Sequence, residues 1–233
     1  MSYKNPILAE IYVEFFLIEP ASSNDQLDLV QILKSNGYDN ITLPNEIYNL
    51  SPPQKTINTK YIRCMNETGD KLIQVSPQVF VMNAIGNYKG KDDFFTFFHS
   101  GVNYLKETNL FNSINGLSLN TIDRLDVVLN DNFLFQDYIN CEGEIVPKWY
   151  KGSIYPIDIN YGKGVPGKDE YNKQVKLSGR INDDKYSFEL QTLLRFQIED
   201  TTLIENFFND IYVESNQIFE NVITDKVRDI MNK

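Results

Sequence analysis

The chain has 233 residues, 42% of them hydrophobic, and its 22 Lys and Arg against 32 Asp and Glu give a formal net charge of −10. A chain of this length and apolar content can bury a sizeable core, which excludes wholesale disorder. The acidic balance argues against nucleic acid and anionic membranes as direct partners, since like charges repel over long range. It favours a basic protein partner, or it serves solubility alone.

The start of the chain and its cysteines indicate a cytoplasmic protein. The stretch MSYKNPILAEIYVEFF lacks the basic segment, apolar run and small-residue cleavage site of a signal peptide. No run of about 18 uncharged apolar residues occurs, so no membrane span is predicted. Cys64 and Cys141 lie far apart and in no metal-binding pattern. We therefore expect two reduced thiols, with no disulfide, no metal and no cofactor.

The first predicted elements are a strand and a helix. Residues 7–18 form an apolar, β-rich run, which predicts a strand buried on one face. A helical period follows, with Ser23 or Asn24 as its N-cap and Gly37 just past its end. The apolar stripe of this helix is Leu27, Val30 and Leu33. Residues 41–58, which contain LP and SPPQ, are typical of a connecting loop.

A hairpin and a second helix are predicted next. Residues 59–86 hold two β-rich runs around a polar turn with a glycine, which predicts the hairpin. Pro77 should lie at a strand edge or break, because it has no amide proton to donate. Residues 91–109 predict the helix, with Asp92 or Asp93 in its first turn. The apolar face of the helix is Phe94, Phe95, Phe98, Val102 and Leu105.

Residues 114–131 return to a period of two and predict a long strand. Asp123 and Arg124 lie inside it and must point to opposite faces, so one of them should face the core or a cleft. A buried charge is costly unless it is paired. Two roles follow: an ion pair that fixes the strand register or holds a helix end, which we favour for Arg124, or a charged lining of a small-molecule cleft. Arg195, in LLRFQIE, is a second strand arginine of this kind.

The C-terminal third begins without a clear pattern. Residues 132–175 are rich in Tyr, Pro and Gly, and no element is assigned to most of them. Residues 175–198 hold two β-rich runs around NDDK, which predicts a second hairpin. The order of hairpin then helix at 59–108 thus recurs at 174–231, which indicates a pseudo-duplication within one domain.

A long C-terminal helix is predicted over residues 202–231. Thr201 or Thr202 with Glu205 resembles a capping box at its start. Its apolar stripe is Leu203, Phe207, Ile211, Ile218, Val222 and Val227. We therefore expect this helix to be part of the core.

The stretch YGKGVPGKDEY raises the question of a nucleotide site. Gly162, Gly167 and Lys168 fit the G-x-x-x-x-G-K part of a phosphate-binding loop. Such a loop needs Ser or Thr after the Lys and then a helix. Here Asp169 follows, Pro166 removes an amide donor, and the next residues have a strand pattern. We therefore expect a flexible, lid-like surface loop that binds no nucleotide.

Other chemistry-bearing residues favour structural roles. His99 is the only histidine and lies on or beside an aromatic helical face, which favours a packed or capping residue over a general base. No E-x-x-H spacing supports a metal site. The acidic pairs fall at turns or helix starts and are explained by solvation: Asp92–Asp93, Asp169–Glu170 and Asp183–Asp184.

Several short motifs together resemble a known family. The stretches YKNPILAEIYVEF, LIQVSPQVFVMNAIGNYKGKDDFFTFF and LSLNTIDRL are similar to an uncharacterised, sporadically distributed prokaryotic family of about this length. The matching positions are Pro6, Pro77, Phe80, Asn83, Tyr88, Ile122, Asp123 and Arg124. Asn120 and Thr121 stand where the family usually has Arg and Tyr, so a site that depends on that Arg would be lost here. The family's patchy occurrence resembles that of mobile or defence-linked genes.

The sequence predicts one α+β domain over residues 1–233. A mainly antiparallel, curved sheet packs on a long C-terminal helix and one or two further helices, with room for a helix-grip-like pocket. The leading hypothesis is a non-catalytic protein that acts through a protein partner, in a prokaryotic defence or toxin-control module, with homo-oligomers left open. The alternative is a small-molecule-binding or enzymatic domain with a cleft lined by strand arginines. No catalytic residue is assigned, and the candidate binding residues are Arg124, Asp123, Arg195 and Asn83.

Overall fold

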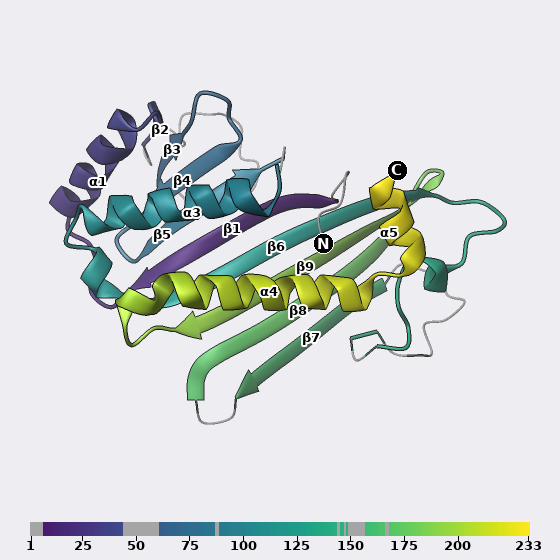
Figure 1. Ribbon diagram of the computed structural model, residues 1–233. Helices are drawn as coiled ribbons and strands as arrows, with labels where there is room; N and C mark the ends of the chain where they lie inside the picture. The colour runs from purple at the N-terminus through teal and green to yellow at the C-terminus, as the bar shows by residue number, and fades with distance from the viewer. Residues whose placement is uncertain are drawn as a thin grey trace. The chain divides into compact units, whose positions relative to one another are not determined.

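The computed structural model (Figure 1) describes residues 7–43, 61–86, 89–143, 145–146, 148, 157–165 and 168–233. It confirms the predicted class, an α+β protein with a curved, mainly antiparallel sheet whose strand order is β2-β3-β4-β5-β1-β6-β9-β8-β7. The chain divides into two compact units. The α3 unit comprises Tyr12–Ser118 and Gln197–Glu205, and the α4 unit comprises Met1–Ile11, Leu119–Phe196 and Asn206–Lys233. The single domain over residues 1–233 stays a prediction.

The α3 unit contains a strand meander and two helices. Its strands are β1 (Leu8–Leu17, of which the first four residues belong to the α4 unit), β2 (Asn40–Thr42), β3 (Ile62–Met65), β4 (Lys71–Val75) and β5 (Val79–Ile85). Its helices are α1 (Ser23–Ser35), α3 (Lys91–Lys106) and the short 3-10 helices η1 (Phe111–Ser113) and η4 (Thr201–Leu203). β3 pairs antiparallel with β2 and β4, and β4 with β5. The predicted hairpin is confirmed, and Pro77 lies in the turn between β4 and β5.

The core of the α3 unit is built from alternate residues of β1 and from α3. Val13, Phe15 and Leu17 are buried, as the period of two predicts. The Phe15 ring stacks on Phe98 of α3, with centroids 5.7 Å apart, and contacts Phe80 of β5 at 5.6 Å. Aromatic rings in such contacts bury large areas, so this cluster supplies much of the unit's hydrophobic stabilisation.

Helix α1 begins and ends where local chemistry allows. Ser22 is the N-cap, one residue earlier than predicted, and it forms a capping box with Asp25. Gly37 follows the helix with φ of 88°, a left-handed conformation that favours glycine. Val30 and Leu33 are buried as predicted, but Leu27 is 51% exposed, and Leu29 takes its place in the core.

Helix α3 approaches β5 closely at a glycine. A Cβ on Gly101 would lie 2.0 Å from Sδ of Met82, which is fully buried. Only glycine therefore lets the Met82 side chain fill this space. The predicted stripe is confirmed at Phe94, Phe98, Val102 and Leu105, whereas Phe95 is half-buried and Phe97 is buried instead.

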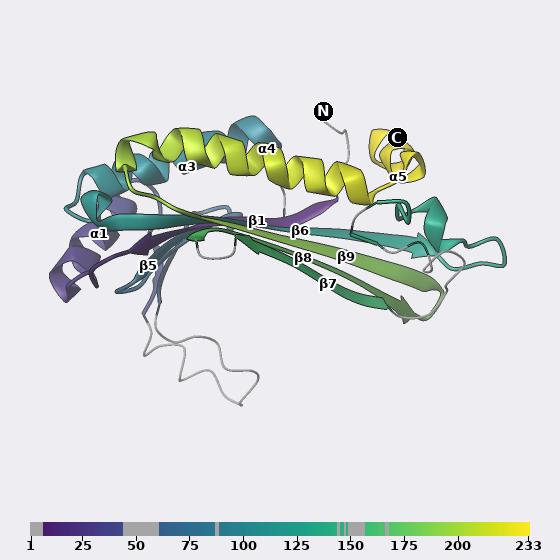
Figure 2. The ribbon, with the colours of Figure 1, turned by 90° about the horizontal axis from the view of Figure 1, so that it is seen from below.

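The α4 unit has longer strands. They are β6 (Ile114–Val128, of which the first five residues belong to the α3 unit), β7 (Ile157–Val165), β8 (Lys168–Asn182) and β9 (Lys185–Gln197). Its helices are the 3-10 helix η2 (Phe135–Asp137), α4 (Ile204–Val222) and α5 (Asp225–Asn232). Figure 2 shows α4 running along one side of β6, β9 and β8. The predicted NDDK hairpin is confirmed, with Asp183 in the left-handed region at its turn.

The predicted C-terminal helix is wrong in one respect: it is two helices. The backbone of Tyr138–Asn140 pairs with the chain at the break, through Asn140 N to Val222 O at 2.7 Å and Thr224 N to Tyr138 O at 3.2 Å. Arg228 then donates to the freed Glu220 carbonyl at 2.6 Å. Helix α4 is interrupted because these contacts replace its own hydrogen bonds.

The start and the buried stripe of the C-terminal helix also differ from the prediction. Asp200, rather than a threonine capping box, accepts from Thr202 N at 2.9 Å. Phe208 is fully buried, whereas Phe207 is half-buried and Leu203 is 42% exposed. The rest of the stripe is confirmed as buried, namely Ile211, Ile218, Val222 and Val227.

The stretch around residues 162–168 is a hairpin instead of the predicted loop. Residues 162–165 lie in β7 and Lys168 opens β8, while Pro166 and Gly167 fall outside the described residues. Gly162 faces Gln174 in the antiparallel register. The strands here are longer than the sequence pattern predicted, because β7 pairs with β8 along its length. The order of meander then helix therefore occurs twice, as β3–β4–β5–α3 and as β7–β8–β9–α4.

Candidate functional site

Strand β6 separates the two charged residues singled out in the sequence. Asp123 is 8% exposed and lies on the side of the sheet that α4 covers, whereas the side chain of Arg124 is 57% exposed on the opposite side. The prediction that one of the pair faces the interior is confirmed. The alternation of β6 therefore places an acid inside and a base outside at adjacent positions.

Arg124 forms an ion pair across the sheet surface. Its Nε donates to Oε2 of Glu189 on β9 at 2.7 Å, and Gln191 Nε2 donates to the other oxygen of Glu189 at 2.7 Å. Partial burial raises the pKa of Glu189, but the hydrogen bonds from Arg124 and Gln191 and the charge of nearby Arg180 outweigh it, so the pKa is lowered. The favoured ion pair between strands is therefore present, but it is not buried, since the side chains of Arg124 and Glu189 are 57% and 30% exposed. An exposed pair of this kind contributes little to stability.

This ion pair belongs to a polar surface, which we call the open face: the side of β6, β9, β8 and β7 opposite α4. Among the described side chains, its cations are Arg124, Lys176, Arg180, Lys185 and Arg195, and its carboxylates are Asp126, Asp158 and Glu189. The strand register shows that these side chains lie on one side of the sheet. Lys176 pairs with Gln191 and Arg180 pairs with Ser187, and both partners lie an even number of residues from Glu189 on β9. Arg195 therefore shares a surface with Arg124, and neither lines the two pockets described below.

Asp123 faces a small apolar cavity beneath α4 and α5. The cavity has a volume of about 20 Å³, and its walls include Leu125, Phe188, Phe219 and Val227. Within the described part of the chain, no hydrogen bond or ion pair reaches the Asp123 carboxyl. Burial raises its pKa to about 7. A volume of this size holds about one water-sized group, so the carboxyl can keep a proton or hold a single small polar molecule.

Other polar groups lie under α4 on the same side of the sheet. The hydroxyls of Thr121 on β6 and Ser215 on α4 are 3.3 Å apart and share a hydrogen bond. Thr192 on β9 is 2% exposed, and its hydroxyl has no partner among the described residues. Thr121 was noted only as a departure from the family pattern. Its position shows that the interior of the α4 unit is partly polar.

A second, larger pocket lies between α4 and the β7–β8 hairpin. Its volume is about 140 Å³, and Tyr161, Lys173 and the segment from Ile218 to Val222 contribute to its walls. The side chain of Lys173 is 18% exposed, with Nζ 3.4 Å from Oε1 of Glu214. The sequence interpretation missed Lys173, although it shares the phase of buried Val175 and Leu177 and is the polar member of that series.

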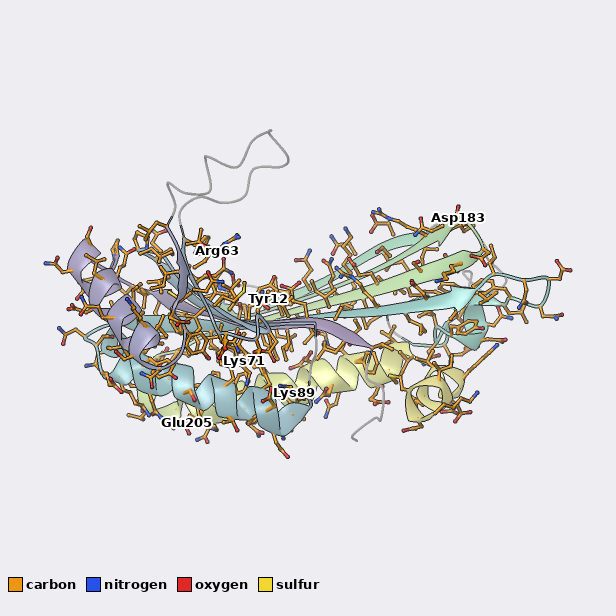
Figure 3. The ribbon with its side chains drawn as sticks, turned by 90° about the horizontal axis from the view of Figure 1, so that it is seen from above. Tyr12, Arg63, Lys71, Lys89, Asp183 and Glu205 are labelled. Atoms are coloured by element: carbon orange, nitrogen blue, oxygen red, sulfur yellow. The ribbon has the colours of Figure 1, made fainter. Side chains whose placement is uncertain are left out.

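The remaining candidates lie elsewhere. Asn83 on β5 is 7% exposed and belongs to the α3 unit. The register places it on the side of that unit's strands away from α3, together with Arg63, which Figure 3 shows opposite Lys71. Nε of Arg63 is buried and donates to no partner among the described residues. Asn83 is therefore not brought together with Asp123, Arg124 or Arg195 within one unit.

His99 and the cysteines take structural positions. The imidazole of His99 is 46% exposed, with Nδ1 3.5 Å from Glu205 Oε2 and its ring against Phe95 and Phe98. Cys64 and Cys141 are both buried as free thiols, and burial raises the pKa of Cys64 to about 11. A thiol with a raised pKa is a poor nucleophile. The cysteines are thus free thiols as predicted, whereas His99 contacts two rings but is only half-buried.

Searches within the described residues add two findings. No group of three or more His, Cys, Asp or Glu side chains there could hold a metal ion. No helix in that part of the chain is both long and apolar enough to cross a bilayer. Compared with known proteins, the chain matches no protein-family model and no curated protein.

Proposed function

We propose that the protein is a non-catalytic, cytosolic interaction protein whose open face binds an acidic segment of a protein partner. The observation that carries the proposal is a local reversal of charge. Among the side chains that the structure describes, the open face holds five cations and three carboxylates, namely Arg124, Lys176, Arg180, Lys185 and Arg195 against Asp126, Asp158 and Glu189. The whole chain has a net charge of −10.

The charge distribution favours this orientation of a partner. Repulsion from the acidic remainder of the chain steers an anionic segment away from other surfaces and toward the open face. Arg180 and Arg195 are exposed there, and arginine presents a planar fork of donors that fits carboxylates. The sequence favours a basic partner because the chain as a whole is acidic. Recognition depends instead on the charge of the surface that a partner contacts, and at the open face this charge is positive.

The biological setting is part of the same proposal. A prokaryotic defence or toxin-control module is suggested by the family resemblance of the sequence, and the partner would then be another component of that module. The identity of a protein bound by the open face tests this setting directly.

A charge-reversal experiment tests the open face. Wild-type protein, the variant Arg180→Glu/Arg195→Glu and the charge-matched control Lys34→Glu/Lys233→Glu would each be used to capture proteins from the source cells. We expect one protein that wild type and control retain and the open-face variant loses, with binding that weakens as salt rises. Equal capture by all three contradicts the proposal. A homodimer that dissociates only in the open-face variant would show that the partner is a second copy.

A further inference from the structure

The pocket between α4 and the β7–β8 hairpin is large enough for a small ligand. Four parts of the chain form its walls: Tyr161, Lys173, the end of α4, and a group made of Asn140, Gly143, Ile145 and Val146. Its volume of about 140 Å³ is close to that of a cavity of roughly 150 Å³ that binds benzene. We propose that this pocket binds a short-chain carboxylate, a monoanion of about six non-hydrogen atoms, which is a size set by that comparison.

Lys173 supplies the charge that selects an anion. Its ammonium group is largely buried, and its described ion pair, with Glu214, is 3.4 Å long. Charge-assisted hydrogen bonds of this kind are usually about 2.7–2.9 Å, so the pair is loose. An ammonium group has three protons to donate. A ligand carboxylate in the pocket gives this partly desolvated cation a second, closer acceptor.

The register places Tyr161 beside Lys173. Tyr161 pairs with Val175 on β8, and Lys173 lies two residues along the same strand, so the two side chains share the face under α4. Both line the pocket. A phenol hydroxyl can donate to a carboxylate oxygen. Tyr161 is thus positioned to contact the same end of a ligand that Lys173 binds.

The rest of the pocket wall combines two asparagines with aliphatic side chains. Asn140 Nδ2 donates to Asn221 O at 3.0 Å, and Glu142 N donates to Asn140 Oδ1 at 3.0 Å. The side-chain amide of Asn140 thus links this part of the wall to helix α4. Val146, Ile218 and Val222 are at most 3% exposed. These side chains offer contact to an alkyl chain. Lys173 is the one cation among the described residues that line the pocket, and a single cation beside aliphatic side chains suits a monoanion better than a phosphate dianion, which would leave one charge uncompensated.

Lys176 provides a matched control on the same strand. It lies three residues from Lys173 and points to the open face, away from the pocket. Lys173→Met and Lys176→Met each remove one positive charge from β8. A carboxylate attracted by general charge would respond to both changes equally, whereas a ligand in the pocket would respond to Lys173 alone.

Methyl-detected NMR titrations test the proposal with butyrate as the probe and n-butylammonium as a cationic probe of similar size. We expect butyrate to shift the Ile218 and Val222 methyl signals saturably, and n-butylammonium to leave them unchanged. Lys173→Met should weaken butyrate at least tenfold, Lys176→Met less than twofold, and Tyr161→Phe by an intermediate factor. If Lys173→Met fails to fold, the butyrate and n-butylammonium titrations of the wild-type protein still test the proposal. No saturable shift with butyrate, or an equal response to n-butylammonium, overturns the assignment.

Discussion

The two units place a long helix on an antiparallel meander but fill the space beneath it differently. In the α3 unit, the rings of Phe15, Phe80 and Phe98 pack together and Gly101 lets α3 approach Met82. Under α4, the corresponding space holds polar groups, among them the Thr121–Ser215 hydrogen bond and the Asp123 carboxyl. The same order of elements therefore supports either a dry core or a partly polar interior.

The contrast separates stability from binding. A dry aromatic cluster stabilises a fold in proportion to the area it buries. Buried polar groups stabilise it only when they are paired, and an unpaired one lowers stability. The α4 unit keeps Asp123 without a partner in the described chain and Lys173 in a loose pair. We infer that the α4 unit gives up stability where it gains the means to bind.

The largest expected effect lies in the dry core. Phe98→Ala should lower the free energy of unfolding by about 3–5 kcal/mol, because a fully buried ring is lost and a cavity remains. Urea denaturation, read from the midpoint at constant slope, measures this change. Phe95→Ala on the same helix is the control and should cost much less, since Phe95 is only half-buried. Equal losses would contradict the assignment of the buried face.

The next effect tests the polar interior through pH. The Asp123 pKa rises from 3.8 in the unfolded chain to about 7 when folded, so the folded state holds a proton that the unfolded state loses. This contribution to stability is complete below about pH 4 and is lost as pH rises to about 7, on the order of 4 kcal/mol in all. Asp123→Asn should remove that slope, and its advantage over wild type should grow from pH 5 to pH 8.

Urea denaturation at each pH measures the slope, and Asp126→Asn is the matched control. Asp126 is an exposed carboxylate on the same strand, so Asp126→Asn makes the same chemical change away from the buried position. Two carboxylates elsewhere act in the opposite direction: hydrogen bonds from Thr68 and Asn66 lower the pKa of Asp70, and those from Thr202 lower that of Asp200. A wild-type slope that survives in Asp123→Asn would exclude Asp123 as its source.

A smaller effect is expected where α3 meets β5. Gly101→Ala should destabilise the protein by about 1–3 kcal/mol, although alanine favours helices, because the new methyl group overlaps the buried Met82 side chain. Met82→Val shortens that side chain and should recover part of the loss in the double variant. Thermal unfolding of the single and double variants gives the coupling energy. Additive effects would mean that the two residues do not compete for this space.

The smallest effect is expected at the open face. Arg124→Ala should change stability by roughly 0.2–1 kcal/mol, because its ion pair with Glu189 is exposed to solvent. The small loss should shrink further at high salt, which screens exposed charges. Denaturation midpoints at low and high salt provide the measurement. A salt-independent loss of several kcal/mol would restore the buried, structural role that the sequence suggested.

Most of the fold could be predicted because its signals are local. The period of two in β1 and β6, the glycine after α1 and the NDDK turn each depend on neighbouring residues alone. The break between α4 and α5 could not be predicted, since the apolar stripe continues through Val222 and Val227. Its cause is backbone pairing with Tyr138–Asn140, more than eighty positions earlier in the chain. Sequence periodicity does not report a contact of that range.

The candidate site was predictable only in part. The period of β6 required Asp123 and Arg124 to face opposite sides, but it could not say which of them was inside. That choice depends on α4 covering one side of the strand. The pocket beside Lys173 was missed because Asn140, Gly143, Ile145 and Val146 form one wall, in a region without a helical or strand pattern. Lys173 could have been recognised from the sequence, because it alternates with the buried Val175 and Leu177 on β8 and is the charged residue of that series.

The division of the chain into segments has a consequence for its synthesis. The α4 unit combines residues from the first strand, the middle of the chain and residues 206–233. On a ribosome, which adds about 5–20 residues per second, the α3 unit lacks only residues 197–205 once Ser118 has emerged, whereas the α4 unit must wait for its last segment. Its long β8–β9 hairpin is thus made before the helix that covers it. During that interval, the apolar side of the hairpin is the surface that a chaperone would have to protect.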